Sequence, residues 1–223
     1  ATVENITLSD SLTNIGGYAF AGCYSLKADD IVIPSTVTSI GEKAFYDTPW
    51  MAKQNENNPL VVVNYILVDG TDTSGDVVIP STVTSIEEGA FRGCDIKNIV
   101  IPDSVTYIGE NAFFNATVEN ITLSDSLTNI GEYAFAYCHY LTDITIPGSV
   151  TDIGNGAFLE CDNLKSAMFR GSVAGMGELV FNECTNLKSV TFQGTDACIG
   201  KGEFSGCGSL TDITLPESVT VIR

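Results

Sequence analysis

The fold of this chain is determined by residues 141–161, LTDITIPGSVTDIGNGAFLEC, because close variants of this segment recur along the sequence. The phenylalanine of the segment returns at Phe20, Phe45, Phe91, Phe113, Phe135, Phe158, Phe181 and Phe204. The differences in residue number between successive copies are 25, 46, 22, 22, 23, 23 and 23. A period of about 23, with one interval of double length, predicts a solenoid of stacked short turns.

Each repeat is predicted to contribute one short strand followed by turns. Residues 143–146 alternate between polar and isoleucine side chains, which is typical of a strand with one buried face. Pro147 ends the strand because it has no N–H to donate. Residues 148–154 supply a second inward-facing pair of side chains, and a single helical or 3₁₀ turn is expected around Phe158 because that stretch is short.

The recurring phrase resembles the leucine-rich repeats of BspA-like surface proteins, the treponemal-type class. Those repeats have the form Leu-x-x-Ile-x-Ile-Pro-x-x-Val-x-x-Ile-x-x-x-Ala-Phe-x-x-Cys, and further copies begin in register at Leu164, Leu187 and Leu210. The resemblance implies a single leucine-rich-repeat solenoid over residues 1–223, with about nine to ten turns of about 23 residues. Short parallel β-strands should line its concave face, with turns and short helical or 3₁₀ segments on the other side. Both ends of the sequence are expected to cut within a repeat.

Residues 46–78 interrupt the pattern and are expected to contain an inserted β-hairpin. Two β-rich runs flank Asn64 and Tyr65, although this pair is not a preferred type I′ or II′ turn. BspA-like proteins often carry insertions marked by Pro-Trp, so the resemblance supports the hairpin. Trp50 is interpreted as the packing anchor of the insertion, with an exposed binding residue as the alternative. The acidic residues 69–76 are interpreted as a turn, with a calcium loop as the alternative.

The composition is strongly acidic, with 28 Asp and Glu against 10 Lys and Arg and a net charge of −18. A negative field repels phosphate backbones and anionic lipids, so nucleic acid is not an expected partner. No apolar run approaches the roughly 18–20 residues that span a bilayer, so direct membrane insertion is not expected either.

Six of the seven cysteines lie three residues after a repeat phenylalanine, at Cys23, Cys94, Cys138, Cys161, Cys184 and Cys207. Thr48 and Ala116 take the same position, which indicates a small packing site occupied by free thiols. Cysteines in neighbouring turns would point the same way, an unfavourable geometry for disulfides. Cys198 lies outside the pattern and is expected to be the most reactive. With His139 as the single histidine and no Cys-x-x-Cys pair, no metal site or cofactor is expected.

A larger duplication overlies the short repeat. Residues 1–23 recur at residues 116–138 with differences only at Gly17/Glu132 and Gly22/Tyr137, so the residue numbers of the two copies differ by 115. Near identity at surface as well as core positions exceeds what packing requires and indicates duplication of whole units. Whether this duplication has a functional role is left open.

The outward-facing strand residues are the candidate binding surface, because alternate strand residues point away from the core. The predicted surface is rich in Asn, Asp and Thr and contains Asn98, Val100, Asn120, Thr122, Asp143, Thr145, Met168, Arg170, Thr191, Gln193, Asp212 and Thr214. Arginine is favoured at binding hot spots. The alternative is that these threonines reflect only the β-preference of the residue.

The sequence argues against an enzyme, because it has one histidine, no GxSxG motif and no phosphate-binding loop. The leading hypothesis is a non-catalytic protein-recognition or adhesion module that is extracellular or on a microbial cell surface. Its partner would be a host matrix or cell-surface protein or a glycan. The alternatives are a structural stalk without a ligand of its own and a scaffold that binds one specific protein. End-to-end self-association through exposed strand edges is a further expectation.

Overall fold

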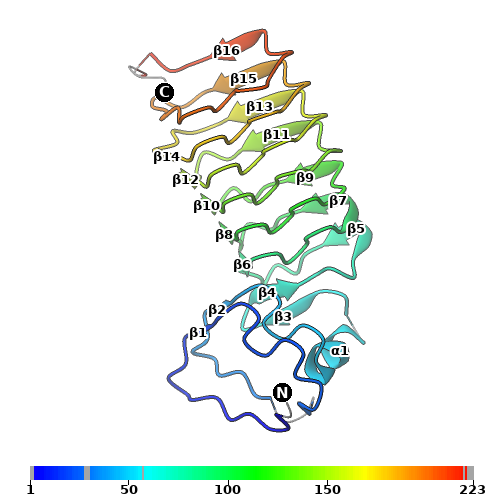
Figure 1. Cartoon of the computed structure of the whole chain (residues 1–223). Coiled ribbons are helices and arrows are strands. Elements are labelled where there is room, and N and C mark those ends of the chain that lie inside the picture. The colour runs from blue at the N-terminus through cyan, green and yellow to red at the C-terminus, as the bar shows by residue number, and fades with distance from the viewer. Residues whose placement is uncertain (1–2, 28–30, 57, 218, 220–223) are drawn as a thin grey trace.

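The chain winds into a column of about nine stacked turns, with the first and last described turns at opposite ends of the column (Figure 1). The structure is a computed structural model and describes residues 3–27, 31–56, 58–217 and 219. The solenoid of stacked turns predicted from the period of the sequence is confirmed. Only one short helix interrupts the strands and turns of the described residues.

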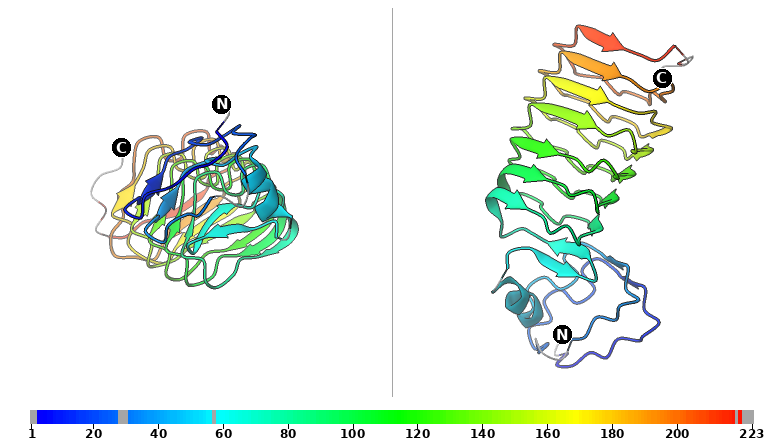
Figure 2. Two further views of the ribbon diagram at one scale, coloured as in Figure 1. Left: turned by 90° about the horizontal axis from the view of Figure 1, so that it is seen from below. Right: turned by 180° about the vertical axis from the view of Figure 1, so that it is seen from behind.

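One side of the column carries the longer strands, which pair in parallel. The first ladder contains β5 (Ser74–Val78), β7 (Asp95–Val100) and β9 (Asn120–Thr122). The second ladder contains β11 (Asp143–Ile146), β13 (Ser166–Phe169), β15 (Ser189–Phe192) and β16 (Asp212–Thr214). Both ladders lie on the same side of the molecule (Figure 2, right). Alternate residues are buried, as the sequence predicts: Ile144 and Ile146 point into the core, whereas Asp143 is exposed.

A second series of parallel strands, which the sequence pattern does not predict, runs along another side of the column. Here each turn contributes only a very short strand, which ends in a buried Ile or Met. These strands are β1 (Asn14–Ile15) paired with β2 (Ser39–Ile40), and β6 (Ser85–Ile86), β8 (Tyr107–Ile108), β10 (Asn129–Ile130), β12 (Asp152–Ile153) and β14 (Gly175–Met176) in one ladder. The sequence predicts a second inward-facing pair of side chains within residues 148–154, and strand β12 lies in that segment.

The Ala-Phe segments form turns that bond to one another along the column. In each repeat the residues two before and two after the phenylalanine have positive φ, as at Asn111 (53°) and Asn115 (56°) around Phe113. Phe114 N–H donates to the carbonyl of Asn111 at 3.0 Å, whereas Phe113 N–H donates to Ala134 in the next turn at 2.7 Å. The bonds of a 3₁₀ turn are therefore present, but the positive φ values on both sides of the phenylalanine prevent a longer helix, and the N–H of the phenylalanine joins each turn to its neighbour.

The repeat phenylalanines form a continuous stack through the larger part of the core. From Phe91 to Phe181, successive ring centroids lie between 5.0 and 5.3 Å apart, with interplanar angles of at most 15°. This spacing is close to the distance of about 4.8 Å between neighbouring strands. Each ring therefore packs on the rings above and below it, which explains why the phenylalanine recurs in every turn.

The insertion begins with a helix that the sequence pattern does not predict. Helix α1 (Pro49–Asn55) starts after Thr48, whose hydroxyl oxygen accepts a hydrogen bond from Met51 N–H at 3.2 Å. A threonine cap followed by proline is a common helix start. Trp50 is only 4% exposed and its ring centroid lies 4.5 Å from that of Phe45. The interpretation of Trp50 as a packing anchor is therefore confirmed.

The predicted hairpin is confirmed in the antiparallel pair β3 (Val61–Val63) and β4 (Ile66–Asp69). Asn64 and Tyr65 at its tip have φ values of 49° and 68°. Both signs are those that a type I′ turn requires, although the pair is not among the preferred ones.

The hairpin separates two hydrophobic clusters. Along β4, Ile66 and Val68 pack in the N-terminal cluster with Phe45, whereas Leu67 between them packs in the larger cluster with Phe91. Opposite faces of one strand therefore belong to different clusters, as the alternation of side chains along a strand requires. The phenylalanine stack is interrupted at this point, which accounts for the double-length interval in the sequence.

Gly70 takes the place of a phenylalanine in the shortened turn after β4. Its N–H donates to Ala90 O at 2.7 Å, the bond that Phe91 makes to the next turn. A Cβ atom on Gly70 would lie 2.4 Å from the ring of Phe91, so no larger residue fits. The acidic side chains of residues 69–76 accept hydrogen bonds from three different donors. Asp69 accepts from Thr71, Asp72 accepts from Asn55, and Asp76 accepts from Asn98. The carboxylates of residues 69–76 thus support a turn.

The cysteines are free thiols, as predicted. In successive turns the thiol donates to the carbonyl oxygen of a phenylalanine of the turn below. The distance is 3.1 Å in each of Cys138 to Phe113, Cys161 to Phe135, Cys184 to Phe158 and Cys207 to Phe181. Cys198 is exposed.

Candidate interaction surface

The structure places every residue of the predicted binding surface on the outer side of the longer strands or directly after them. We call this surface the long-strand face. It contains Asn98 and Val100 in β7, Asn120 and Thr122 in β9, Asp143 and Thr145 in β11, Met168 in β13 and Arg170 after it, Thr191 in β15 and Gln193 after it, and Asp212 and Thr214 in β16. That these residues contact a ligand stays a prediction.

Along the first ladder, the polar side chains of the long-strand face are joined by hydrogen bonds. Asn98 Nδ2 donates to Asp76 Oδ1 at 2.6 Å, and Asn120 Nδ2 donates to Asn98 Oδ1 at 2.8 Å. In the second ladder, Ser166 Oγ donates to Asp143 Oδ1 at 2.5 Å. These bonds hold the polar groups in fixed orientations from one strand to the next.

Beside this polar row runs a central row of threonines and exposed apolar side chains. Val78 is 83% exposed, Val100 is 59% exposed and Met168 is 37% exposed. The remaining positions of the row are Thr122, Thr145, Thr191 and Thr214. The long-strand face therefore combines ordered hydrogen-bonding groups with uncovered apolar area, a combination found where proteins bind partners.

The two ladders are separated by a seam between β9 and β11, which are not paired with each other. The seam lies where the repeat length changes. The polar-row residue follows its phenylalanine by seven positions at Asn120 and by eight positions at Asp143. The added residue lies in the loop between Cys138 and Leu141, where the preceding turns have one residue fewer. One extra residue before a strand displaces it relative to the strand below, which removes the regular pairing.

Proline adds a second cause for the seam. In the second ladder, the residue after each strand donates to the strand below: Arg170 N–H donates to Ile146 O at 3.0 Å and Gln193 N–H donates to Phe169 O at 2.8 Å. Pro147 holds the equivalent position after β11 and has no N–H group. The bond that would join the end of β11 to β9 is therefore absent.

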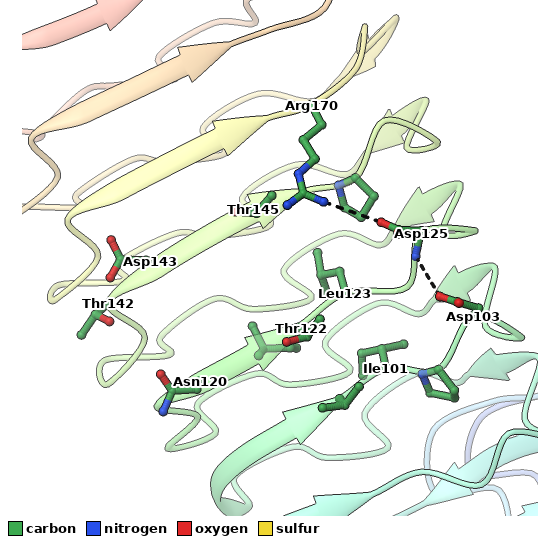
Figure 3. Close-up of a pocket in the computed structure, with 14 residues that line it drawn as sticks. Ile101, Asp103, Asn120, Thr122, Leu123, Asp125, Thr142, Asp143, Thr145 and Arg170 are labelled. Atoms are coloured by element: carbon green, nitrogen blue, oxygen red, sulfur yellow. Dashed lines mark hydrogen bonds and ion pairs between the residues drawn. The ribbon is translucent and has the colours of Figure 1, made fainter.

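A hollow of about 620 Å³ opens over the seam, and we call it the seam hollow (Figure 3). Its apolar lining includes Ile101, Ile121 and Leu123, and its polar lining includes Asp103 and Asp125. Residues of the predicted surface line it too, namely Val100, Asn120, Thr122, Asp143, Thr145 and Arg170. The sequence analysis misses Asp103, Asp125, Ile101 and Leu123, although the lengthening of the phenylalanine interval after Phe135 marks the place.

One end of the seam hollow carries an ion pair. Arg170 Nη1 lies 3.8 Å from Asp125 Oδ1, and the N–H of Asp125 donates to Asp103 Oδ1 at 3.3 Å. Both side chains of the ion pair are more than half exposed, so the pair contributes little to stability. The ion pair matters because it shows that a guanidinium group fits in the hollow beside Asp125.

Two buried carboxyl groups lie away from the long-strand face. Burial raises the pKa of Glu87, and burial raises the pKa of Glu203 to about 7. Glu203 Oε2 accepts a hydrogen bond from Val180 N–H at 3.1 Å, and Glu87 accepts from Ser39 and Ser85. Each is thus engaged in joining one turn to another.

Metal and membrane sites are not found in the part of the chain that the structure describes. No group of three or more His, Cys, Asp or Glu side chains there is placed to hold a metal ion. No helix within the described ranges is long and apolar enough to cross a bilayer.

Comparison with solved structures supports the fold. A leucine-rich-repeat protein of T. pallidum is similar over 68% of this chain and 75% of its own length, with 30% identity and a TM-score of 0.62. A leucine-rich cell-surface protein of Faecalibacterium prausnitzii matches 98% of this chain and 61% of its own length, with 22% identity and a TM-score of 0.56. The pneumococcal vaccine antigen PcpA matches 82% of this chain and 49% of its own length, with 20% identity and a TM-score of 0.55. The chain thus spans less than two thirds of the last two proteins, and no curated protein sequence matches it significantly.

The family comparison covers the whole chain. The sequence matches the BspA type leucine-rich repeat region over residues 1–117, 69–185 and 108–223. These overlapping matches follow the repeats from which the stacked turns are built, including the turns on both sides of the seam. The chain therefore belongs to the BspA-type leucine-rich-repeat family of non-catalytic repeat proteins.

Proposed function

We propose that this chain is a protein-recognition or adhesion module of an extracellular or microbial cell-surface protein, and that it binds through the long-strand face. Its ligand would be a host matrix protein, a cell-surface protein or a glycan. The observation that carries the proposal is the row of exposed apolar side chains, Val78, Val100 and Met168, beside the hydrogen-bonded Asn and Asp row. Apolar area rimmed by ordered polar groups favours a binding role.

The comparisons are consistent with this location. The F. prausnitzii protein of the same fold is described as a leucine-rich cell-surface protein, and the pneumococcal protein is described as a vaccine antigen. Free thiols are more common in reducing compartments, but those of this chain are compatible with an extracellular position. Most of them are buried in the core, where they are protected from oxidants.

A pair of matched double variants tests the role of the long-strand face. Met168→Asp with Arg170→Glu makes the net charge of the face more negative by three. Leu179→Asp with Lys201→Glu makes the same change of charge in the turn segments, where both residues are exposed. Leu179 has a φ of 61°, which aspartate tolerates better than leucine, so the control variant is not expected to lose stability.

The measurement is binding of the purified chain to immobilised matrix proteins and to intact cells. We expect the Met168/Arg170 variant to bind less strongly by about tenfold or more, since hot-spot residues cost about 2 kcal/mol or more when replaced. The Leu179/Lys201 variant should bind like the unchanged chain. Equal binding by both variants would contradict a role for the long-strand face.

A structural stalk is the second candidate function. It is favoured by the stack of phenylalanine rings, which is uninterrupted from Phe91 to Phe181, and by the duplication of residues 1–23 at residues 116–138. A stalk holds another domain at a distance and needs no ligand. Under this alternative, neither double variant changes attachment, whereas deletion of whole turns does.

A further inference from the structure

The geometry of the seam points to a more specific role for the seam hollow within the proposed function. We infer that the seam hollow is a recognition pocket for a basic side chain, lysine or arginine, carried by an extended peptide segment of a partner protein. This inference rests on the proposal that the long-strand face binds a partner. It adds the chemical class of the partner and the place where it is recognised.

The first argument is the direction of the hydrogen bonds along the polar row. Asn98 donates to Asp76 and Asn120 donates to Asn98, so each amide uses its nitrogen toward the turn below and presents its oxygen to the turn above. At the seam the next polar-row side chain above Asn120 is Asp143, which is an acceptor and already binds Ser166. Two acceptors therefore occupy successive positions of the polar row at the hollow.

Figure 3 shows the amide oxygen of Asn120 directed toward the side of β11, where Asp143 lies. At three other steps of the row, an amide or a hydroxyl group supplies the donor, namely from Asn98 to Asp76, from Asn120 to Asn98 and from Ser166 to Asp143. A group with several N–H donors and a positive charge complements this pair of acceptors. Ammonium and guanidinium groups have both properties.

The second argument is that the hollow already holds a guanidinium group at its other end. Arg170 reaches across from the end of β13 to Asp125, at 3.8 Å, and Asp125 in turn is joined to Asp103 through its N–H group (Figure 3). The end at Asp143 has a comparable acidic group, and Arg170 is the one cation among the residues that line the hollow, all of which the structure describes. Charge complementarity therefore favours a cation from a partner at the Asp143 end.

Between the Asp125 end and the Asp143 end, the lining of the seam hollow is partly apolar. Val100, which is 59% exposed, and the half-buried Ile121 offer apolar surface in the hollow, and apolar surface of this kind accommodates the methylene stem of lysine or arginine. A second hollow of about 340 Å³ adjoins the first, shares Asn120 and Thr142 with it, and is also lined by Glu119, Tyr140, Asn163 and Lys165. The groove along the seam thus continues past the Asp143 end, which fits an extended peptide.

The test uses the intact chain and short fluorescent peptides as probes. The peptides are Ac-Val-Thr-Lys-Val-Thr-Val-amide and two relatives in which norleucine or glutamate replaces the lysine, and binding is measured by fluorescence anisotropy. We expect the lysine peptide to bind about tenfold more tightly than the norleucine peptide, which corresponds to about 1.4 kcal/mol. The glutamate peptide should bind least, and added salt should weaken the lysine peptide most.

The chain offers a matched control for the acceptor. The tripeptide Thr-Asp-Ile occurs at residues 142–144 and again at residues 151–153, and Asp143 and Asp152 are each exposed at the start of a strand. Only Asp143 lines the seam hollow, and Asp152 lies outside the long-strand face. Asp143→Asn should weaken binding of the lysine peptide about tenfold and leave the norleucine peptide unchanged, whereas Asp152→Asn should change neither.

A second pair of variants tests the hollow without changing any charge. Thr122→Trp fills the hollow, and Thr106→Trp places the same side chain at an exposed position outside the long-strand face and the hollow. Thr122→Trp should abolish binding of the lysine peptide, and Thr106→Trp should preserve it.

Several outcomes would overturn the pocket. These are equal effects of Asp143→Asn and Asp152→Asn, equal affinity for the lysine and norleucine peptides, and absence of binding by the lysine peptide. The double variants described above then decide the fate of the wider proposal. If Met168/Arg170 replacement still reduces binding to matrix proteins, the pocket is wrong and the long-strand face remains the binding surface. If that replacement has no effect either, both proposals fail.

Discussion

The hydroxyl group of Ser39 donates a hydrogen bond to the buried carboxylate of Glu87, 3.3 Å away, across the junction created by the insertion. Ser85 donates to the other carboxylate oxygen of Glu87 at 3.1 Å. Glu87 lies where other turns have glycine, such as Gly109, at which a Cβ atom would approach the backbone of the turn below to 2.7 Å. Below Glu87 the chain is the hairpin strand β4 in place of a regular turn. Glu87 therefore replaces the usual glycine at the junction beside the hairpin, and its hydrogen bond with Ser39 links the two sides of that junction.

The stability of this junction should depend on pH through Glu87. Burial raises the pKa of its carboxyl group in the folded state. A raised pKa means that the folded chain holds the proton more tightly than the unfolded chain, so this group's contribution to stability falls as pH rises above about 4.5. Glu87→Gln removes the charge. The variant should therefore exceed the unchanged chain in free energy of unfolding by more at pH 8 than at pH 5. Urea unfolding at both pH values measures this, and exposed Glu119→Gln is the control.

Glu203 should produce a stronger dependence at the other end of the column. It occupies the position of alanine in most other repeats, its pKa is raised by burial to about 7, and its Oε1 has no hydrogen-bond partner among the described residues. Stability should fall between pH 4.5 and pH 7 as this carboxyl group becomes charged in the folded chain. Glu203→Gln should raise the melting temperature at pH 8 and leave it nearly unchanged at pH 5. A rise of equal size at both pH values would contradict the assignment to its charge.

The phenylalanine stack should carry a large share of the stability. Phe135 is fully buried between Phe113, at 5.0 Å, and Phe158, at 5.2 Å. Phe135→Ala leaves a cavity that two adjoining rings cannot fill, and it should lower the free energy of unfolding by about 3–5 kcal/mol. Phe114→Ala is the control, since Phe114 is only half-buried outside the stack and should cost about 1 kcal/mol. Urea denaturation followed by far-UV circular dichroism compares the two.

The cysteines should differ sharply in reactivity. Burial raises the pKa of Cys138 to about 12, and its thiol donates to a backbone carbonyl. Thiolate is the reactive form, so such thiols should react with an aromatic disulfide reagent only after unfolding. Exposed Cys198 should react rapidly in the folded chain, and Cys198→Ser should remove the rapid phase. A rapid phase that survives this substitution would show that a thiol of the core ladder is accessible.

The solenoid could be predicted because the core positions of the repeat follow one period. The duplicated segment shows that the period alone does not predict which repeats form a strand. Residues 1–23 and 116–138 are nearly identical, yet residues 120–122 form strand β9 whereas residues 5–7 form no strand. Leu127 is fully buried and its counterpart Leu12 is half-buried. Among the described residues, the first copy has a stacking neighbour on one side only. A strand in this fold depends on its neighbours, and a single repeat does not contain that information.

The candidate surface could be predicted only in part, because a single repeat determines which strand residues point outward but not how neighbouring turns stack. Alternation along each strand places Asp143 and Thr145 outward, and the structure agrees. The seam hollow depends instead on how two turns of unequal length stack, which no single repeat determines. The extra residue between Cys138 and Leu141 and the missing N–H of Pro147 are visible in the sequence. Their combined effect appears only when β9 and β11 are placed next to each other.

The hairpin that divides the core has a consequence for how such a protein evolves. Since Ile66 and Leu67 face different clusters, the turns on either side of β4 share little side-chain packing. A turn can be copied, exchanged or altered on one side without repacking the other. Nearly the same segment, at residues 1–23 and at residues 116–138, contributes core residues to each of the two clusters. The hairpin thus acts as a boundary between two parts of the array that can change independently.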